Sequence, residues 1–144
     1  IITSIEHNAP DAQLDGILIE SMINNAILEL MVSLRRDPQF GFVLTVASGG
    51  VMTEIYKDAS TVLVPADDIS LMAALESLHI APLFNGFRGG PAASRTAVLD
   101  QIKCLVSLME GTPDIIEIEI NPLMVGTDYA CCADALISIS GTVA

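Results

Sequence analysis

The sequence contains few basic residues. Six Lys and Arg stand against 18 Asp and Glu, which gives a formal net charge of −12 at pH 7. A nucleic-acid surface needs a patch of Lys and Arg to offset phosphate charge, so this composition argues against nucleic acid as a partner. If an anionic nucleotide binds here, a bound cation must offset the local repulsion.

Long apolar runs and targeting signals are also missing. The chain has no uninterrupted apolar run of roughly 18 or more residues, so we expect no transmembrane helix and no membrane partner. No basic segment followed by an apolar one opens the chain, so no signal peptide is visible. The first residue is not Met, and we expect the chain to be a piece of a longer protein.

Cysteine is scarce, with residues at positions 104, 131 and 132 only. Their spacing does not match a metal site, and neighbouring cysteines rarely bridge each other. We therefore expect buried, reduced thiols in a cytoplasmic protein. A catalytic thiol is the less favoured alternative.

The length of 144 residues fits one domain with a sizeable core. Hydrophobic residues make up 51% of the chain, above the usual range of about 45–50%. Combined with the acidic charge, this content indicates that a partner covers part of the surface, and we expect an oligomer.

Short alternating segments dominate the first half of the chain. They predict strands over residues 16–22, 28–35, 42–47, 51–56 and 61–64, with turns at 37–41 and 48–50. Two helices follow, one capped by Asp67 and one that begins after Ser94 and stops at Gly111. This order predicts an α+β domain with a mostly antiparallel sheet and its helices on one face.

The most informative segment covers residues 115–123. Apolar and polar residues alternate in it with period two, which is typical of a strand with one buried face. The apolar face holds Ile116, Ile118 and Ile120, and the other face holds Glu117, Glu119 and Asn121. Hard divalent cations such as Mg²⁺ prefer such oxygen ligands.

Residues 129–139 predict the second strand of a hairpin. A turn centred near Gly126 and Thr127 would place Glu119 opposite Asp134, with Asn121 diagonal to Asp134. The three side chains would then meet around one cation. A slip of one residue would move Asp134 to the other face of the sheet. The alternative is a half-buried edge hairpin with solvated carboxylates.

The motifs also occur in the order of a known family. Together they resemble the ATP-grasp region of NDP-forming acyl-CoA synthetases, and the resemblance is carried by segments 15–22, 29–32, 37–41 and 49–51, by Glu54, and by segments 57–58, 86–89, 117–123 and 134–135. The resemblance covers nearly the whole chain. It implies that residues 1–144 form a single domain, the second (C-terminal) lobe of an ATP-grasp fold. Related lobes occur in succinyl-CoA synthetase β subunits and fused to acetyltransferase domains.

The resemblance implies ATP or ADP as a ligand, held by residues from three places in the chain. The backbone at Ile19 and Glu20 would form the hinge beside the adenine. Glu29 would accept the ribose hydroxyls. Gly49 and Gly50 would let the backbone approach a phosphate, since glycine lacks a side chain.

The resemblance also implies a magnesium site. Asn121 and Asp134 match metal-coordinating positions. Glu119 matches either the carboxylate beside the phosphorylated histidine, and hence a catalytic group, or a second metal position. Arg88, in a Gly-rich loop, is expected to bond loop carbonyls, with phosphate binding as the alternative.

The implied reaction converts an acid, CoA and ATP into acyl-CoA, ADP and phosphate, with phosphoryl passing through a histidine elsewhere in the enzyme. The first ATP-grasp lobe and the CoA-binding domain would lie outside this chain, in the same or a separate polypeptide. We therefore expect an acid–CoA ligase as part of a larger protein, and no turnover by the isolated chain.

Four residues depart from the family pattern. Val62 and Leu136 stand where we expect arginine, and Ser33 and Phe42 stand where we expect glycine and proline. The lost arginines favour a second hypothesis, a degenerate, non-catalytic ATP-grasp module with a regulatory or assembly role, for example in an acetyltransferase fusion. A third hypothesis is a plain interaction domain with a solvated acidic face.

Overall fold

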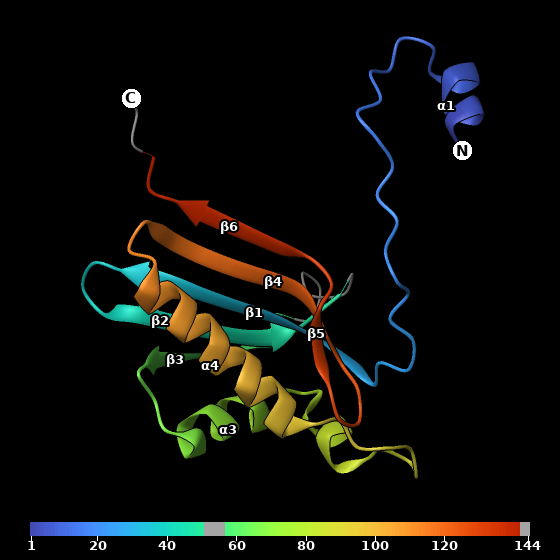
Figure 1. The fold of residues 1–144 in the computed structure, drawn as a ribbon. Helices are drawn as coiled ribbons and strands as arrows, with labels where there is room; N and C mark the ends of the chain where they lie inside the picture. Colours follow the sequence, from blue (N-terminus) through green and yellow to red (C-terminus); the bar gives the residue numbers. More distant parts are fainter. Residues whose placement is uncertain (51–56, 142–144) are drawn as a thin grey trace.

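Antiparallel pairing organises the chain, as the sequence predicts. The structure, a computed structural model, describes residues 1–50 and 57–141. In these residues six strands form one sheet, and helices cover one of its faces (Figure 1). The elements are α1 (Ile2–Asn8), β1 (Leu28–Asp37), β2 (Gly41–Ser48), β3 (Ala59–Val64), α3 (Asp68–Glu76), the 3₁₀ helix η1 (Ala81–Asn85), α4 (Arg95–Gly111), β4 (Ile115–Val125), β5 (Ala130–Cys132) and β6 (Ala135–Ile139).

The strand order is β3-β2-β1-β4-β5, with β6 also paired to β4. Each of these pairs is antiparallel. The first part of β4 pairs with β6, and its last three residues pair with β5. The predicted α+β class and the strands near 28–35, 42–47 and 61–64 are therefore confirmed. The strand expected at 51–56 lies outside the described residues.

The core lies between the sheet and the helices α3 and α4. Alternate residues of β1 are buried on this side, namely Leu28, Leu30, Val32 and Leu34. The predicted apolar stripe of α4 is buried against them through Val98, Ile102, Leu105 and Met109. Removal of these side chains from water is the main stabilising contribution, at about 25 cal/mol per Å² of apolar surface.

Both predicted helix caps are present. The Asp67 carboxylate accepts the backbone N–H of Ser70 at 2.8 Å. The Ser94 hydroxyl accepts the N–H of Ala97 at 3.2 Å. Each bond satisfies one of the N–H groups that the first turn of a helix leaves without a partner.

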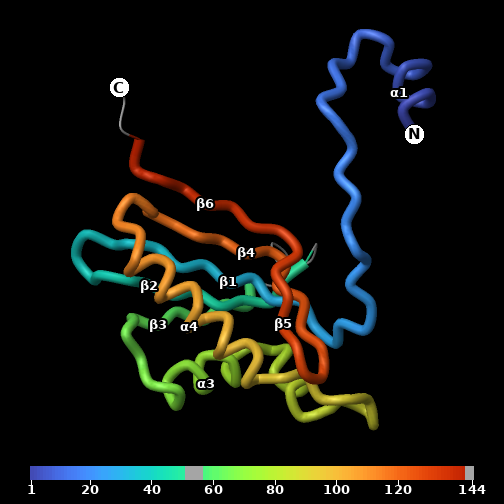
Figure 2. The backbone as a smooth tube through the Cα atoms, viewed as in Figure 1, coloured from blue at the N-terminus to red at the C-terminus, as the bar shows by residue number. Residues whose placement is uncertain are grey.

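The N-terminal segment differs from the prediction. Residues 9–27 form an extended arm that leads from α1 to β1; its first part stands away from the sheet, and its last residues return to the β4–β5 hairpin (Figures 1 and 2). The strand expected at 16–22 is wrong, because no described strand lies beside this segment to pair with it. Several large apolar side chains of the arm are exposed as a result, namely Leu14, Ile17, Leu18, Ile19 and Met22.

A β-bulge interrupts the pairing of β4 with β1. Leu30 pairs with Leu123 and Val32 with Ile120, so Met31 of β1 faces both Asn121 and Pro122 of β4. The extra residue changes which positions of β4 face the core. The buried side chains are Ile118 and Ile120 before the bulge, then Leu123 and Val125 after it.

Two further expectations about burial are wrong. Ile116 is exposed and Ile115 is buried instead, because the β4–β6 pairing is irregular between Ile115 and Glu117. All three cysteines are free and exposed.

The described helices include none that is both long and apolar enough to cross a membrane.

Candidate functional site

The hairpin of β4 and β6 brings the predicted oxygen ligands together in a shifted register. Glu119 faces Leu136, and the backbone N–H of Asn121 donates to the carbonyl of Asp134 at 3.1 Å. The prediction that Glu119 faces Asp134 is therefore wrong. Asn121 lies opposite Asp134, and Glu119 lies diagonal to it.

The shift arises from the connection between the strands. The N–H of Gly126 donates to the carbonyl of Tyr129 at 2.9 Å, which closes a turn centred between Thr127 and Asp128. The register moves by two residues as a consequence. A shift of the register by two does not by itself change the face on which a side chain lies, whereas a shift by one would reverse the faces.

The end of β2 packs directly against this hairpin and β1. The N–H of Gly49 donates to the carbonyl of Glu29 at 2.8 Å, and the N–H of Gly50 donates to Asn121 Oδ1 at 3.3 Å. A Cβ atom on Gly49 would lie 2.5 Å from the backbone carbon of Leu30. A Cβ on Gly50, whose φ is +75°, would collide with the Glu29 carboxylate. Both positions therefore require glycine.

The donor set fits a partly protein-bound magnesium ion. The Asn121 carbonyl oxygen accepts one bond from Gly50 and keeps a second lone pair for a cation. Asp134, which lies opposite Asn121 in the hairpin, is exposed. Among residues 1–50 and 57–141, no group of three or more His, Cys, Asp or Glu side chains is placed to hold a metal. Mg²⁺ often takes only one or two carboxylates and completes its shell with phosphate oxygens and water.

The neighbouring carboxylates of β4 differ in their surroundings. Glu117 accepts a hydrogen bond from the Ser33 hydroxyl at 3.0 Å. Glu119 lies opposite Ser33 in the strand register, and the described part of the chain supplies it with no hydrogen bond or ion pair. Ser33, at a position where the family resemblance implies glycine, therefore holds Glu117 and leaves Glu119 available.

A hollow of about 580 Å³ lies between the N-terminal arm and the β4–β5 hairpin. Glu29 pairs with Met124, and Met124 pairs with Cys131, so a row across three strands lines it. Glu20 and Met22 line it from the arm. The predicted pair Glu20 and Glu29 therefore meets at one hollow, although residues 16–22 form no strand. Ile19 is 87% exposed and is not part of the lining.

The sequence prediction missed the sulfur-containing residues of this hollow. Met124 and Cys131 join Glu29 only because the bulge at Asn121 and Pro122 changes the phase of β4. The alternation of residues 115–121 gives no sign of this change. The hydroxyl of Tyr129 also donates to the carbonyl of Asn24 at 3.0 Å and ties the arm to the hairpin.

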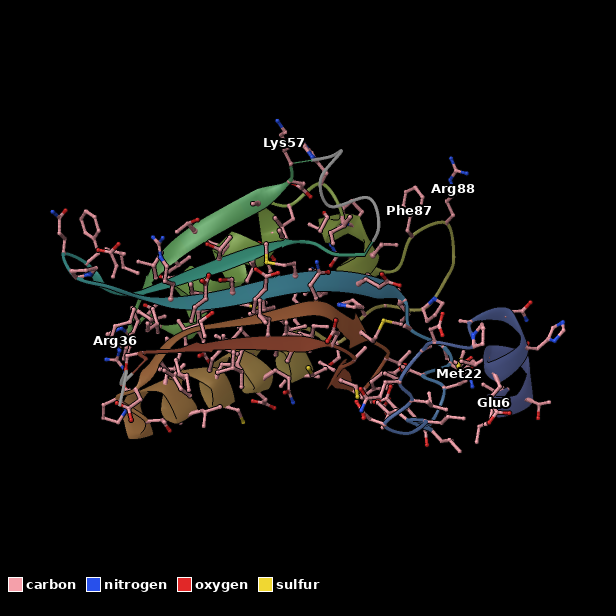
Figure 3. The ribbon with its side chains drawn as sticks, turned by 90° about the horizontal axis from the view of Figure 1, so that it is seen from above. Glu6, Met22, Arg36, Lys57, Phe87 and Arg88 are labelled. Carbon is pink, nitrogen blue, oxygen red and sulfur yellow. The ribbon has the colours of Figure 1, made fainter. Side chains whose placement is uncertain are left out.

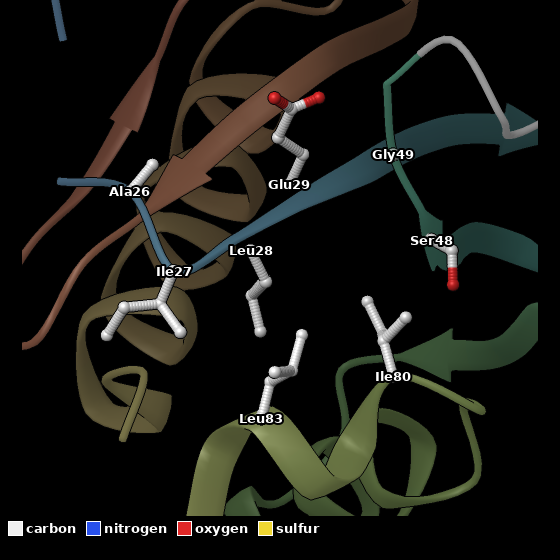
Figure 4. A pocket seen from close by; sticks show the side chains of 8 residues that line it. All are labelled: Ala26, Ile27, Leu28, Glu29, Ser48, Gly49, Ile80 and Leu83. Carbon is white, nitrogen blue, oxygen red and sulfur yellow. The ribbon is translucent and has the colours of Figure 1, made fainter. Parts of the chain in front are cut away.

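A second hollow, of about 310 Å³, lies near the start of β1 and the end of β2. Its interior is apolar, with the side chains of Leu28, Ile80 and Leu83 directed toward one another (Figure 4). The Glu29 carboxylate points away from these three residues (Figure 4). The Glu29 carboxylate therefore lies on the face of the sheet opposite the apolar side chains, where Gly50 approaches both Glu29 and Asn121.

Arg88 does not have the predicted contacts. Its guanidinium lies 5.2 Å from the ring centre of Phe87 and bonds no carbonyl of the described residues. Figure 3 shows both side chains at the tip of their loop, on the side of the sheet away from α4. The expected role in bonding loop carbonyls is therefore wrong.

The chain matches known proteins over most of its length. The family model described as an ATP-grasp domain matches residues 1–139. A trans-feruloyl-CoA synthase from an unknown prokaryotic organism is 37% identical over 112 residues, which cover 78% of this chain and 16% of that protein. The beta subunit of acetate–CoA ligase (ADP-forming) I from Pyrococcus furiosus is 32% identical over 135 residues, which cover 94% of this chain and 58% of that subunit.

Solved structures agree with these relatives. The dinucleotide-forming acetyl-coenzyme A synthetase 1 of Candidatus Korarchaeum cryptofilum, in complex with coenzyme A, Ca-AMPCP and HgCl⁺, matches with a TM-score of 0.81 and 27% identity. The match covers 96% of this chain and 60% of that chain. The same synthetase in complex with coenzyme A and Mg-AMPPCP matches with a TM-score of 0.73 and 26% identity, over 78% of this chain and 53% of that one. The chain thus spans only part of each of these proteins.

Proposed function

The chain belongs to the ATP-grasp domain family, and from this premise we propose that it is the nucleotide- and magnesium-binding second lobe of an ADP-forming acyl-CoA synthetase. The observation that carries the proposal is the contact of Gly50 with both Glu29 and Asn121, beside the hollow that Glu20 and Glu29 line. Residues implied for ribose, phosphate and metal meet at this one place.

The nucleotide would lie along the row of Glu29, Met124 and Cys131. The apolar and sulfur-containing part of the hollow suits a planar base, and the Glu29 carboxylate suits the hydroxyls of a ribose. The arm at Ile19 and Glu20 would close over the base through its backbone. The glycines at the end of β2 would then face the phosphates.

Magnesium would be held by Asn121 and Asp134, with Glu119 beside them. When bound, Mg²⁺ neutralises phosphate charge and orients the phosphates for transfer. The chain's own task is to hold these oxygens in place, and Glu119 is the carboxylate we assign to catalysis. The relative solved with Mg-AMPPCP supports a nucleotide and Mg²⁺ as the ligands of this lobe.

The complete protein would convert an acid, CoA and ATP into acyl-CoA, ADP and phosphate through a phosphohistidine. The first ATP-grasp lobe and the CoA-binding domain would come from the remainder of the same polypeptide or from a partner chain. The partial coverage of the relatives supports this division. The exposed apolar arm supports a covering partner or an oligomer, and the free thiols support a cytoplasmic location.

One observation favours a second candidate function. Leu136, which is 67% exposed, stands opposite Glu119 at a position where the family resemblance implies arginine. A missing cation at this point favours a lobe that binds nucleotide without turnover and serves regulation or assembly.

The test uses a protein that joins this chain to the first lobe and the CoA-binding domain. Titration calorimetry should detect ATP binding that depends on Mg²⁺. Asn121→Ala and Asp134→Ala should each weaken it by about tenfold or more, as loss of a metal ligand or its partner does. Asp128→Ala, at the tip of the same hairpin, is the matched control and should leave the affinity unchanged.

Unchanged binding in both site variants would overturn the assigned metal site. Binding without formation of acyl-CoA and ADP would favour the regulatory function. Turnover by residues 1–144 alone would contradict the division of the protein into separate lobes.

A further inference from the structure

A buried carboxylate, that of Asp58, lies directly before β3. Among the described residues, Ser48 and Asp58 are the buried polar residues, at 6% and 8% exposure. Ser48 is the last residue of β2, and Asp58 directly precedes β3. The N–H of Ser48 donates to the carbonyl of Asp58 at 3.0 Å, and the Ser48 hydroxyl donates to Asp58 Oδ2.

The same carboxylate reaches the segment that follows α3. The backbone N–H of His79 donates to Asp58 Oδ2 at 2.9 Å and to Oδ1 at 3.1 Å. The His79 ring nitrogen Nδ1 lies 3.2 Å from Oδ1, while the ring itself is largely exposed. Asp58 thus joins the end of β2, the start of β3 and the segment before η1 through one side chain.

Burial of a carboxylate is costly unless hydrogen bonds compensate it. A fully satisfied polar network fixes one geometry, whereas an apolar contact tolerates several. This network holds the backbone at Ser48, which directly precedes Gly49 and Gly50. The N–H groups of these two glycines bond Glu29 and Asn121.

We propose that Asp58 is a positioning residue of the nucleotide site, holding the Gly49–Gly50 backbone in register with Glu29 and Asn121 through Ser48. Asp58 itself touches neither nucleotide nor metal. The inference rests on the proposed function for the identity of the site, whereas the clamp itself can be measured without any ligand.

The first experiment measures amide hydrogen exchange in the complete protein without nucleotide. Asp58→Asn keeps the shape of the side chain but removes its charge and half of its acceptor capacity. The Gly49 amide should exchange on the order of tenfold faster in this variant, because its local opening becomes easier. Ser48→Ala removes one of the donors and should give a smaller increase.

The matched control is Asp37→Asn. The Asp37 carboxylate also fixes a strand connection, because it accepts the N–H groups of Gln39 and Phe40 at 2.9 and 3.1 Å between β1 and β2. It lies at the opposite end of β1 from Glu29. Asp37→Asn should change the exchange of its own turn and leave that of Gly49 as in the unaltered protein.

The second experiment measures Mg²⁺-dependent ATP affinity well below the unfolding temperature of every variant. Asp58→Asn should weaken binding on the order of tenfold, as displacement of positioned groups does. Asp37→Asn should not, even where both variants lose similar thermal stability. Combining Ser48→Ala with Asp58→Asn should add little, since both act through one network.

The outcomes separate the two proposals. Absence of ATP binding in the unaltered protein would overturn the proposed function, and the Gly49 exchange rate would still decide whether Asp58 is a clamp. Normal ATP binding by Asp58→Asn, with lower thermal stability alone, would overturn the positioning role. An unchanged Gly49 exchange rate in Asp58→Asn would overturn the clamp itself.

Discussion

The backbone N–H of Gly50 donates to the side-chain oxygen of Asn121 across 3.3 Å. Because an N–H group can only donate, this bond sets the carboxamide with its oxygen toward β2 and its nitrogen away. Gly50, two residues after the end of β2, and the bulge of β4 are thereby joined to each other. Asn121, which is implied in metal binding, therefore also has a structural role through its bond to Gly50. The structural role and the metal-binding role need separate measurements.

Asn121→Ala leaves the Gly50 N–H without this acceptor and should lower the free energy of unfolding by about 1 kcal/mol. Asn121→Asp retains an acceptor oxygen and should lose less. Urea unfolding without metal or nucleotide checks both values. Equal losses in the two variants would show that the Gly50 bond does not stabilise the fold.

Gly50→Ala should destabilise the chain by more than about 1 kcal/mol, because its positive φ and the nearby Glu29 carboxylate both oppose a side chain. Glu29→Ala removes the steric part only. A double-mutant cycle by chemical unfolding should therefore show coupling between the two positions. Strict additivity would contradict the close approach of Gly50 to Glu29.

Thiol labelling should report occupancy of the hollow. All three cysteines should react in the folded protein, and Cys132 should react more slowly than Cys131, because burial and then the neighbouring Cys131 and Asp134 raise the pKa of its thiol. ATP with Mg²⁺ should protect Cys131 and Cys132, which line the hollow. Cys104, on α4, is the internal control. Protection of Cys104 to the same extent would indicate general tightening of the protein and not occupancy.

Asp67 should make the stability of α3 depend on pH. The hydroxyl of Ser70, and then its backbone N–H, hold the pKa of the Asp67 carboxyl below its ordinary value of 3.8. A lowered pKa in the folded state means that its contribution is present above the ordinary value and is lost as pH falls through the folded value. Asp67→Asn keeps a capping side chain without the charge. Its stability deficit should therefore be present at pH 7 and vanish at strongly acidic pH. A deficit independent of pH would contradict this charge effect.

Leu34→Ala should destabilise the chain by about 2–5 kcal/mol, since Leu34 is fully buried under the helices. Leu63→Ala is the matched control on β3, where the side chain is 52% exposed. It should change stability by less than about 1 kcal/mol. Similar losses at the two positions would contradict the assigned core face of the sheet.

Local signals predicted the parts of the fold that local physics determines. Asp67 and Ser94 cap their helices because a side-chain oxygen satisfies N–H groups within three residues. The alternation of residues 28–35 predicted β1 because one face packs against α3 and α4. In these segments the local sequence pattern was sufficient to predict the element.

The incorrect predictions concern features that depend on contacts between segments distant in the sequence. Residues 16–22 alternate like a strand, but pairing requires a second strand, and none lies beside the arm in the described residues. The predicted pairing of Glu119 with Asp134 was wrong because the turn near Thr127 is centred farther along the chain than expected. A shift of the register by two does not by itself change the face on which a side chain lies, and the metal site stays a prediction. Met124 stayed unrecognised because the bulge depends on pairing with Met31.

The bulge of β4 allows one strand to serve both the site and the core. Ile120 and Leu123 both face the core although they are three positions apart, because two residues of β4 lie opposite Met31 between them. Loss of Asn121 or Pro122 would restore regular alternation and leave Leu123 opposite Leu30, with its side chain still inward. A change in the length of the strand at this point would therefore alter the surroundings of Gly50 and Asp134, and not the packing under the helices.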